Sequence, residues 1–140
     1  MKLIITYRLM LLCIGFLTMS QQGFSQNTSM DWVAESFLLN VNGTDVEISS
    51  NITKQGTAIV WEQQNPGTTQ STTFNLISVT GSWNIQNGTG SIDYELDQEG
   101  ISATMNVIGT SEGITITLTY YANNSSTDEM IFQIDNLDQL

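Results

Sequence analysis

The chain has 140 residues, including three Lys or Arg, fourteen Asp or Glu, one Cys and no His. The lack of His excludes an imidazole base, a Ser-His-Asp triad and any zinc site that uses His. A length of 140 residues is typical of one domain.

Residues 1–25 have the features of a signal peptide. Lys2 and Arg8 form a positive segment, and an apolar run follows from 9 to 19. This run is shorter than the roughly 20 residues that a membrane-spanning helix needs, and it has the length of a signal-peptide core. We therefore expect export to the periplasm, the cell surface or the medium, by a bacterial pathway. An uncleaved membrane anchor is the alternative.

Gly23 and Ser25 have the spacing of the small residues before a cleavage site, so cleavage would leave a single domain at 26–140. Cys13 would suit a lipid anchor, but Leu12 before it is not small. The domain keeps Lys54 as its one basic residue and has a formal net charge of −13. Such a chain lacks the basic clusters that bind nucleic acid or anionic membrane surfaces. Its protein partners, if any, stay undefined.

Most of the domain alternates between apolar and polar residues, as half-buried strands do. The clearest example is 114–121, where apolar side chains alternate with three threonines. Between Phe74 and Val79 the alternation slips, which indicates a bulge. The rows predicted to face inward are Thr57, Ile59 and Trp61; Ile92, Tyr94 and Leu96; Ile101, Ala103, Met105 and Val107; Ile114, Ile116, Leu118 and Tyr120; and Met130, Phe132 and Ile134.

The segment 29–41 is ambiguous. Its apolar residues fit a helical stripe, which Ser29 could cap, and they also fit a strand from about Ala34 to Val41. Because the rest of the chain favours strands, we expect a first strand here, preceded at most by one helical turn.

Turn signals separate the strands at short intervals. Asn42-Gly43 and Asn87-Gly88 predict two-residue type I′ turns, while 65–67 predicts a longer loop. Glu99-Gly100 and Glu112-Gly113 predict further turns. The sequence therefore predicts an all-β fold, an antiparallel up-and-down meander of seven to nine strands that forms a small closed or partly open barrel. A two-sheet sandwich is the alternative.

Large apolar residues on the predicted inner faces are candidates for contact with one small ligand. An apolar ligand is expected, because no charged residue falls on those faces; a packed core is the alternative. Tryptophans 32, 61 and 83 could instead stack on sugars if they were exposed. The candidate ligand-binding residues are Trp61, Phe74, Trp83, Tyr94, Met105, Tyr120 and Phe132.

Acidic residues alternate from Asp93 to Glu99 and predict a solvated outer strand face. Neighbours in such a row lie about 6.6–6.8 Å apart, so calcium would need ligands from a second strand or a loop, and no metal-binding residue is predicted. The alternative function for the chain is an acidic interaction or structural module at the cell surface, with or without calcium. Lys54 is expected at an exposed hairpin tip. With few general acids and no activated nucleophile, we expect neither an enzyme nor a cofactor.

The segment 81–85, Gly-Ser-Trp-Asn-Ile, is followed by Asn87-Gly88 and by the alternating residues 91–94. This pattern resembles small secreted lipocalin-like proteins of Gram-negative bacteria, over about 60–120. The resemblance implies an up-and-down barrel that binds a small apolar molecule. The chain differs from that pattern in having Met30-Asp31 before Trp32, and no Arg to pack over a tryptophan at the barrel base.

Overall fold

The computed structural model describes residues 29–122 and 126–140, so the predicted signal peptide lies outside the described residues. Nine antiparallel strands are present and no helix is found in these ranges. The strands are β1 (Trp32–Val41), β2 (Thr44–Gln55), β3 (Ala58–Asn65), β4 (Thr68–Asn84), β5 (Thr89–Gln98), β6 (Ile101–Thr110), β7 (Gly113–Ala122), β8 (Ser126–Ile134) and β9 (Asn136–Gln139).

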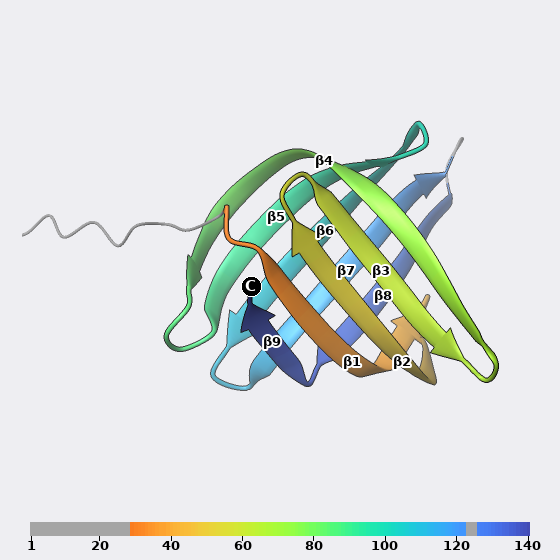
Figure 1. The fold of residues 1–140 in the computed structure, drawn as a ribbon, viewed down its shortest axis with the longest axis horizontal. Coiled ribbons are helices and arrows are strands. Elements are labelled where there is room, and N and C mark those ends of the chain that lie inside the picture. The colour runs from red at the N-terminus through yellow and green to blue at the C-terminus, as the bar shows by residue number, and fades with distance from the viewer. Residues whose placement is uncertain (1–28, 123–125) are drawn as a thin grey trace, which may run out of the picture.

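The strands form a closed barrel (Figure 1). Each strand from β2 to β7 pairs with the strand that follows it, and β1 closes the barrel by pairing with both β2 and β8. The predicted all-β meander and barrel are therefore confirmed, and the sandwich alternative is wrong. Within the segment 29–41, the expected strand is present as Trp32–Val41 and begins two residues earlier than predicted.

The ninth strand extends the β8 side of the barrel past a bend at Asp135. β1 pairs with β8 over Leu38–Val41 and with β9 over Trp32–Glu35. At the bend, the backbone N–H of Asp135 donates to the carbonyl of Glu35, and the N–H of Phe37 donates to the Asp135 carboxylate. Asp135 thus supplies the hydrogen bonds that the interrupted ladder lacks.

The turns follow the predictions in part. Asn42-Gly43 and Glu99-Gly100 are two-residue turns with positive φ at both residues, which is the type I′ requirement. Asn87-Gly88 is different, because β4 and β5 are joined by the four residues 85–88 and only Gly88 has positive φ. The longer loop expected at 65–67 is also wrong, since Asn65 pairs with Thr68 across a two-residue turn.

Two bulges set which residues face inward. The predicted one lies between Leu76 and Ser78, and the extra residue, Ile77, is 65% exposed. The second, which the sequence did not reveal, lies between Ser36 and Leu38 on β1. It places Phe37 and Leu38 together on the outside, with Phe37 59% exposed.

The barrel interior holds the hydrophobic core, because inward residues alternate along each strand. The inward rows predicted for β5 to β8 are buried or partly buried, apart from Ile101, which is exposed next to a turn, as is Thr57. The fully buried side chains at the centre are Phe74, Met105, Ile116, Leu118 and Phe132.

The two ends of the barrel are named by what lies at them. The terminal end is where residues 29–31 enter and where Leu140 lies; the N–H of Leu140 donates to the carbonyl of Asp31 (Figure 1). The far end carries the turns 42–43, 66–67 and 99–100.

Candidate functional site

At the terminal end, a tryptophan and a lysine lie side by side inside the barrel. Trp32 and Lys54 are directly opposite each other on β1 and β2, and both point inward. Trp32 is fully buried and Lys54 is only 3% exposed. The expectation that Lys54 lies exposed at a hairpin tip is therefore wrong. A signal was available, since Lys54 alternates with Ile52 on the inner face of β2.

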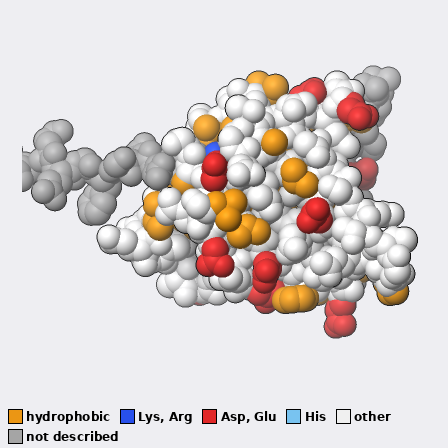
Figure 2. Space-filling model, viewed as in Figure 1, with side chains coloured by type: hydrophobic (Ala, Val, Ile, Leu, Met, Phe, Trp, Pro, Cys, Tyr) orange, Lys and Arg blue, Asp and Glu red, His pale blue; other side chains and the backbone are white. Residues whose placement is uncertain are grey.

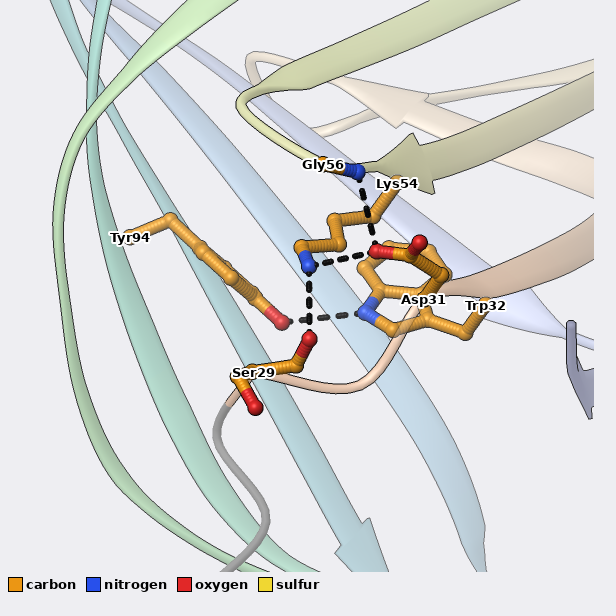
Figure 3. Close-up of polar contacts among 6 residues, drawn as sticks. All are labelled: Ser29, Asp31, Trp32, Lys54, Gly56 and Tyr94. Carbon is orange, nitrogen blue, oxygen red and sulfur yellow. Dashed lines mark hydrogen bonds and ion pairs between the residues drawn. The ribbon is translucent and has the colours of Figure 1, made fainter.

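Lys54 is fixed by the segment that enters the barrel. Its Nζ donates to Asp31 Oδ1 at 2.7 Å and to the carbonyl of Ser29 at 3.0 Å (Figure 3). The N–H of Gly56 also donates to Asp31 Oδ1, at 2.9 Å. The Lys54 hydrogen bond, followed by that of Gly56, lowers the pKa of Asp31. The buried ammonium is thus neutralised locally.

Tyr94 belongs to the same end. The indole Nε1–H of Trp32 donates to its hydroxyl oxygen at 2.9 Å, and the two ring centroids are 6.2 Å apart (Figure 3). Burial is the main cause that raises the pKa of Tyr94. We refer to Ser29, Asp31, Trp32, Lys54, Gly56 and Tyr94 as the terminal network.

Trp83 also packs near the terminal end, because β4 ends one residue after it. A Cβ on Gly109 would lie 2.5 Å from the Trp83 ring and 2.1 Å from the carbonyl oxygen of Gly88. Gly109 therefore makes room for the indole to lie against the β6 backbone. Trp83 is held by this packing, well away from the far end.

The other candidate residues meet nearer the centre. Trp61 contacts Phe132 edge to face, with ring centroids 5.3 Å apart, and Phe74 contacts Tyr120 at 5.6 Å. Met105 is fully buried and pairs with Tyr94 across β5 and β6. All seven candidate residues thus face the interior, but Trp83 and Tyr94 make their contacts in the packing of the terminal end.

Two buried polar atoms on the inner wall have no hydrogen-bond partner within the described residues, and sequence reasoning missed both. They are Ser50 Oγ and Trp61 Nε1. Ser50 is 1% exposed and Trp61 8%. Trp61 lies opposite Ile52, and Ser50 is the next inward residue along β2, so the two are diagonal neighbours on one face.

The interior has two different walls. On β2 to β4, inward positions near the far end carry the polar residues Ser50, Gln63 and Thr72. On β5 to β8 the inward positions are apolar up to Leu96, Tyr120 and Met130, of which Tyr120 and Met130 are partly exposed. Beyond them, at the rim of the far end, the same alternation reaches Gln98 and Asp128; Asp128 pairs with Tyr120 and accepts a hydrogen bond from Asn42. Burial raises the pKa of Tyr120 to about 12. In the part of the chain that the structure describes, Lys54 is the only buried charged residue.

The acidic row on β5 lies on the outer surface, as expected. Asp93 accepts a hydrogen bond from Asn106, Glu95 from Ser78, and Asp97 from the N–H of Gly100. Over residues 29–122 and 126–140, no three acidic side chains converge in a way that could hold a metal ion. Acidic side chains are scattered over the face shown in Figure 2, and almost no Lys or Arg surface is visible there.

The bulge on β1 produces a shallow outer groove. It has a volume of about 570 Å³ and an apolar floor formed by the exposed Phe37 and Leu38. The remaining lining residues are Glu47, Ile48, Ser49, Gln133 and Asp135.

The three tryptophans are buried, so the proposal that they stack on sugars at the surface is wrong. A helix long and apolar enough to cross a membrane is absent from the described ranges. Comparison with protein-family models, with curated proteins and with solved structures found no match to this chain.

Proposed function

We propose that this protein is an exported, non-catalytic, lipocalin-like barrel that binds one small apolar ligand through its far end. The observation that carries the proposal is the combination of an apolar interior with a single buried charge that is already neutralised. Lys54 is paired with Asp31, while Tyr120 and Met130 bring the apolar surface to solvent at the far end. Apolar surface of this kind favours an apolar occupant.

The terminal end supports the lipocalin-like assignment. In the family that the sequence resembles, an Arg packs over a tryptophan at the barrel base. Here Lys54 lies beside Trp32 at the end where the chain enters the barrel. This lysine on the second strand would take the place of that arginine, since residues 26–140 contain no Arg.

The experiment that tests this proposal is native mass spectrometry of the exported protein from its own host, compared with its denatured mass. A removable extra mass of a few hundred daltons is the expected result. Titration of the stripped protein with retinol, a fatty acid or haem, followed by tryptophan fluorescence, gives an independent readout.

Two adjacent tyrosines provide a matched pair of variants. Tyr120→Glu places a charge on the inner face near the far end, and we expect it to weaken binding at least ~10-fold. Tyr121 points outward and is 47% exposed, so Tyr121→Glu should leave binding unchanged. Equal loss in both variants, or no bound or added ligand in the wild type, would overturn the proposal.

The outer groove favours a second candidate function, an acidic interaction module at the cell surface. Glu47 and Asp135 flank an apolar floor on a chain with a large negative charge, which suits a cationic protein segment. Glu47→Gln with Phe37→Ser would then abolish binding of a lysine-rich peptide and leave ligand binding in the barrel unchanged. The acidic row on β5 does not bring calcium ligands together and adds nothing to this candidate.

A further inference from the structure

We infer that the ligand carries an uncharged hydrogen-bond acceptor, such as a carbonyl, ester or ether oxygen or a hydroxyl group, which is bound by Ser50 Oγ and Trp61 Nε1. This inference rests on the proposed function and names the class of ligand that the same site would take.

The first step concerns the two atoms themselves. Both are buried, and neither has a hydrogen-bond partner in the described part of the chain. A buried polar group without a partner is unfavourable, so most such groups in folded proteins are satisfied. A group that remains unsatisfied inside a binding barrel is therefore available to a ligand.

A neighbouring serine shows that the wall can satisfy a hydroxyl. Ser36 lies opposite Ser50 in the β1–β2 ladder and is equally buried. Its Oγ donates to the carbonyl of Leu38 at 2.9 Å, at the bulge on β1. Ser50, across the ladder from Ser36, has no such partner within the described residues.

The chemistry of the two groups defines the ligand's polar group. The indole N–H of Trp61 can only donate, and the hydroxyl of Ser50 can donate as well. Because the two residues are diagonal neighbours on one wall, a single ligand in the barrel can present acceptor oxygen to both.

The charge of the site excludes a carboxylate as that acceptor. Lys54 is the one buried cation of the described chain, and it already donates to Asp31 and Ser29 at the terminal end. A carboxylate at Ser50 and Trp61 would be buried without a counter-ion, which is strongly unfavourable. The apolar body of the ligand would contact Phe132, which packs against Trp61, and Tyr120 toward the far end.

The test uses three ligands that share one body and differ in the polar group: retinal, retinol and retinoic acid. Affinities are measured by calorimetry at pH 8, where retinoic acid is ionised, for the stripped wild type and for Ser50→Ala, Trp61→Phe and Ser36→Ala. We expect retinal and retinol to bind at least ~10-fold more tightly than retinoic acid. Each of the first two variants should weaken retinal binding roughly fivefold, as the loss of one hydrogen bond does, whereas Ser36→Ala should not.

The outcomes separate the inference from the proposed function. Tighter binding of retinoic acid, or unchanged retinal binding in both Ser50→Ala and Trp61→Phe, overturns the inference and leaves an apolar-ligand barrel. Failure of all three retinoids to bind, together with no removable mass in native mass spectrometry, overturns both. Circular dichroism of each variant checks that the barrel is folded. If Trp61→Phe does not fold, the retinal affinity of Ser50→Ala, the smaller change, decides the outcome.

Discussion

Buried polar groups have hydrogen-bond partners at the terminal end of the barrel, whereas around Ser50 they have none within the described chain. At the terminal end, Lys54 Nζ has two acceptors and Trp32 Nε1 binds the Tyr94 hydroxyl. Around Ser50, a hydroxyl and the Trp61 N–H are buried without partners in the described chain. The difference indicates that the terminal end stabilises the fold, while the second region keeps hydrogen-bonding capacity that the fold itself does not use.

The largest expected effect comes from the packing of the terminal end. Gly109→Ala would force a methyl group against the Gly88 carbonyl and the Trp83 ring, and we expect a loss of about 3 kcal/mol in the free energy of unfolding. Urea denaturation measures it. Ile108→Ala, at the exposed neighbouring position, is the control and should cost well under half as much. Similar losses in both variants would show that Trp83 does not depend on Gly109.

Two of the three buried tryptophans, Trp32 and Trp61, sharpen the comparison directly. Trp32→Phe removes ring volume and leaves the Tyr94 hydroxyl without its donor, so we expect a loss of about 2–3 kcal/mol. Trp61→Phe removes similar volume but also an unpartnered N–H, so a loss of about 1 kcal/mol is expected. Denaturant unfolding of the ligand-free protein gives both values. If Trp61→Phe were the more damaging change, the two regions would not differ as described.

The paired serines provide a finer test. Ser36→Ala breaks the hydrogen bond to Leu38 and should destabilise the ligand-free protein by about 1 kcal/mol. Ser50→Ala removes a buried hydroxyl that has no partner, and should be neutral or stabilising by up to about 1 kcal/mol. Thermal unfolding measures both variants: Ser36→Ala should lower the melting temperature, and Ser50→Ala should leave it unchanged or raise it. A clear loss of stability in Ser50→Ala would reveal a partner for that hydroxyl.

The smallest expected effect is a loss of folding stability at low pH that comes from Asp31 at the terminal end. Lys54, and then Gly56, hold the pKa of Asp31 below its ordinary value of 3.8. A carboxyl whose pKa is lower in the folded state contributes stability above the unfolded pKa and loses it as pH falls through the folded pKa. The stability advantage of the wild type over Asp31→Asn should therefore be full at pH 7 and shrink below about pH 4. An advantage that is constant from pH 7 to pH 2 would contradict this.

Much of the barrel follows from local sequence pattern. Inward residues on β5 to β8 alternate strictly, so the pattern alone correctly assigns residues such as Tyr94, Met105 and Phe132 to the interior. The slip in alternation before Val79 likewise locates the bulge next to Ile77. Alternation reports on burial directly, because successive side chains in a strand point to opposite faces.

The features that escaped prediction depend on partners far along the chain. Lys54 follows the inward alternation of β2, but its burial requires Asp31 and the Ser29 carbonyl, and no local pattern reveals that pairing. The bulge at Ser36 was hidden because Phe37, Leu38 and Leu39 are all apolar, so either face could be inward. The unpartnered atoms of Ser50 and Trp61 could not be found from sequence, since a missing hydrogen bond leaves no trace in it.

The dual pairing of β1 has a consequence for how the protein folds. Its partner β2 follows at once in the chain, but β8 and β9 come after all the other strands. The pairing of β1 with β8 and β9, which closes the barrel, therefore joins residues that are far apart in sequence. Contacts of such long range slow folding, because the chain must close a large loop before they form. Until then, β1 has an unpaired edge beside an exposed apolar inner face, which is a surface prone to aggregation. Under the proposed export, a chain delivered strand by strand across a membrane would meet this hazard before β8 and β9 arrive.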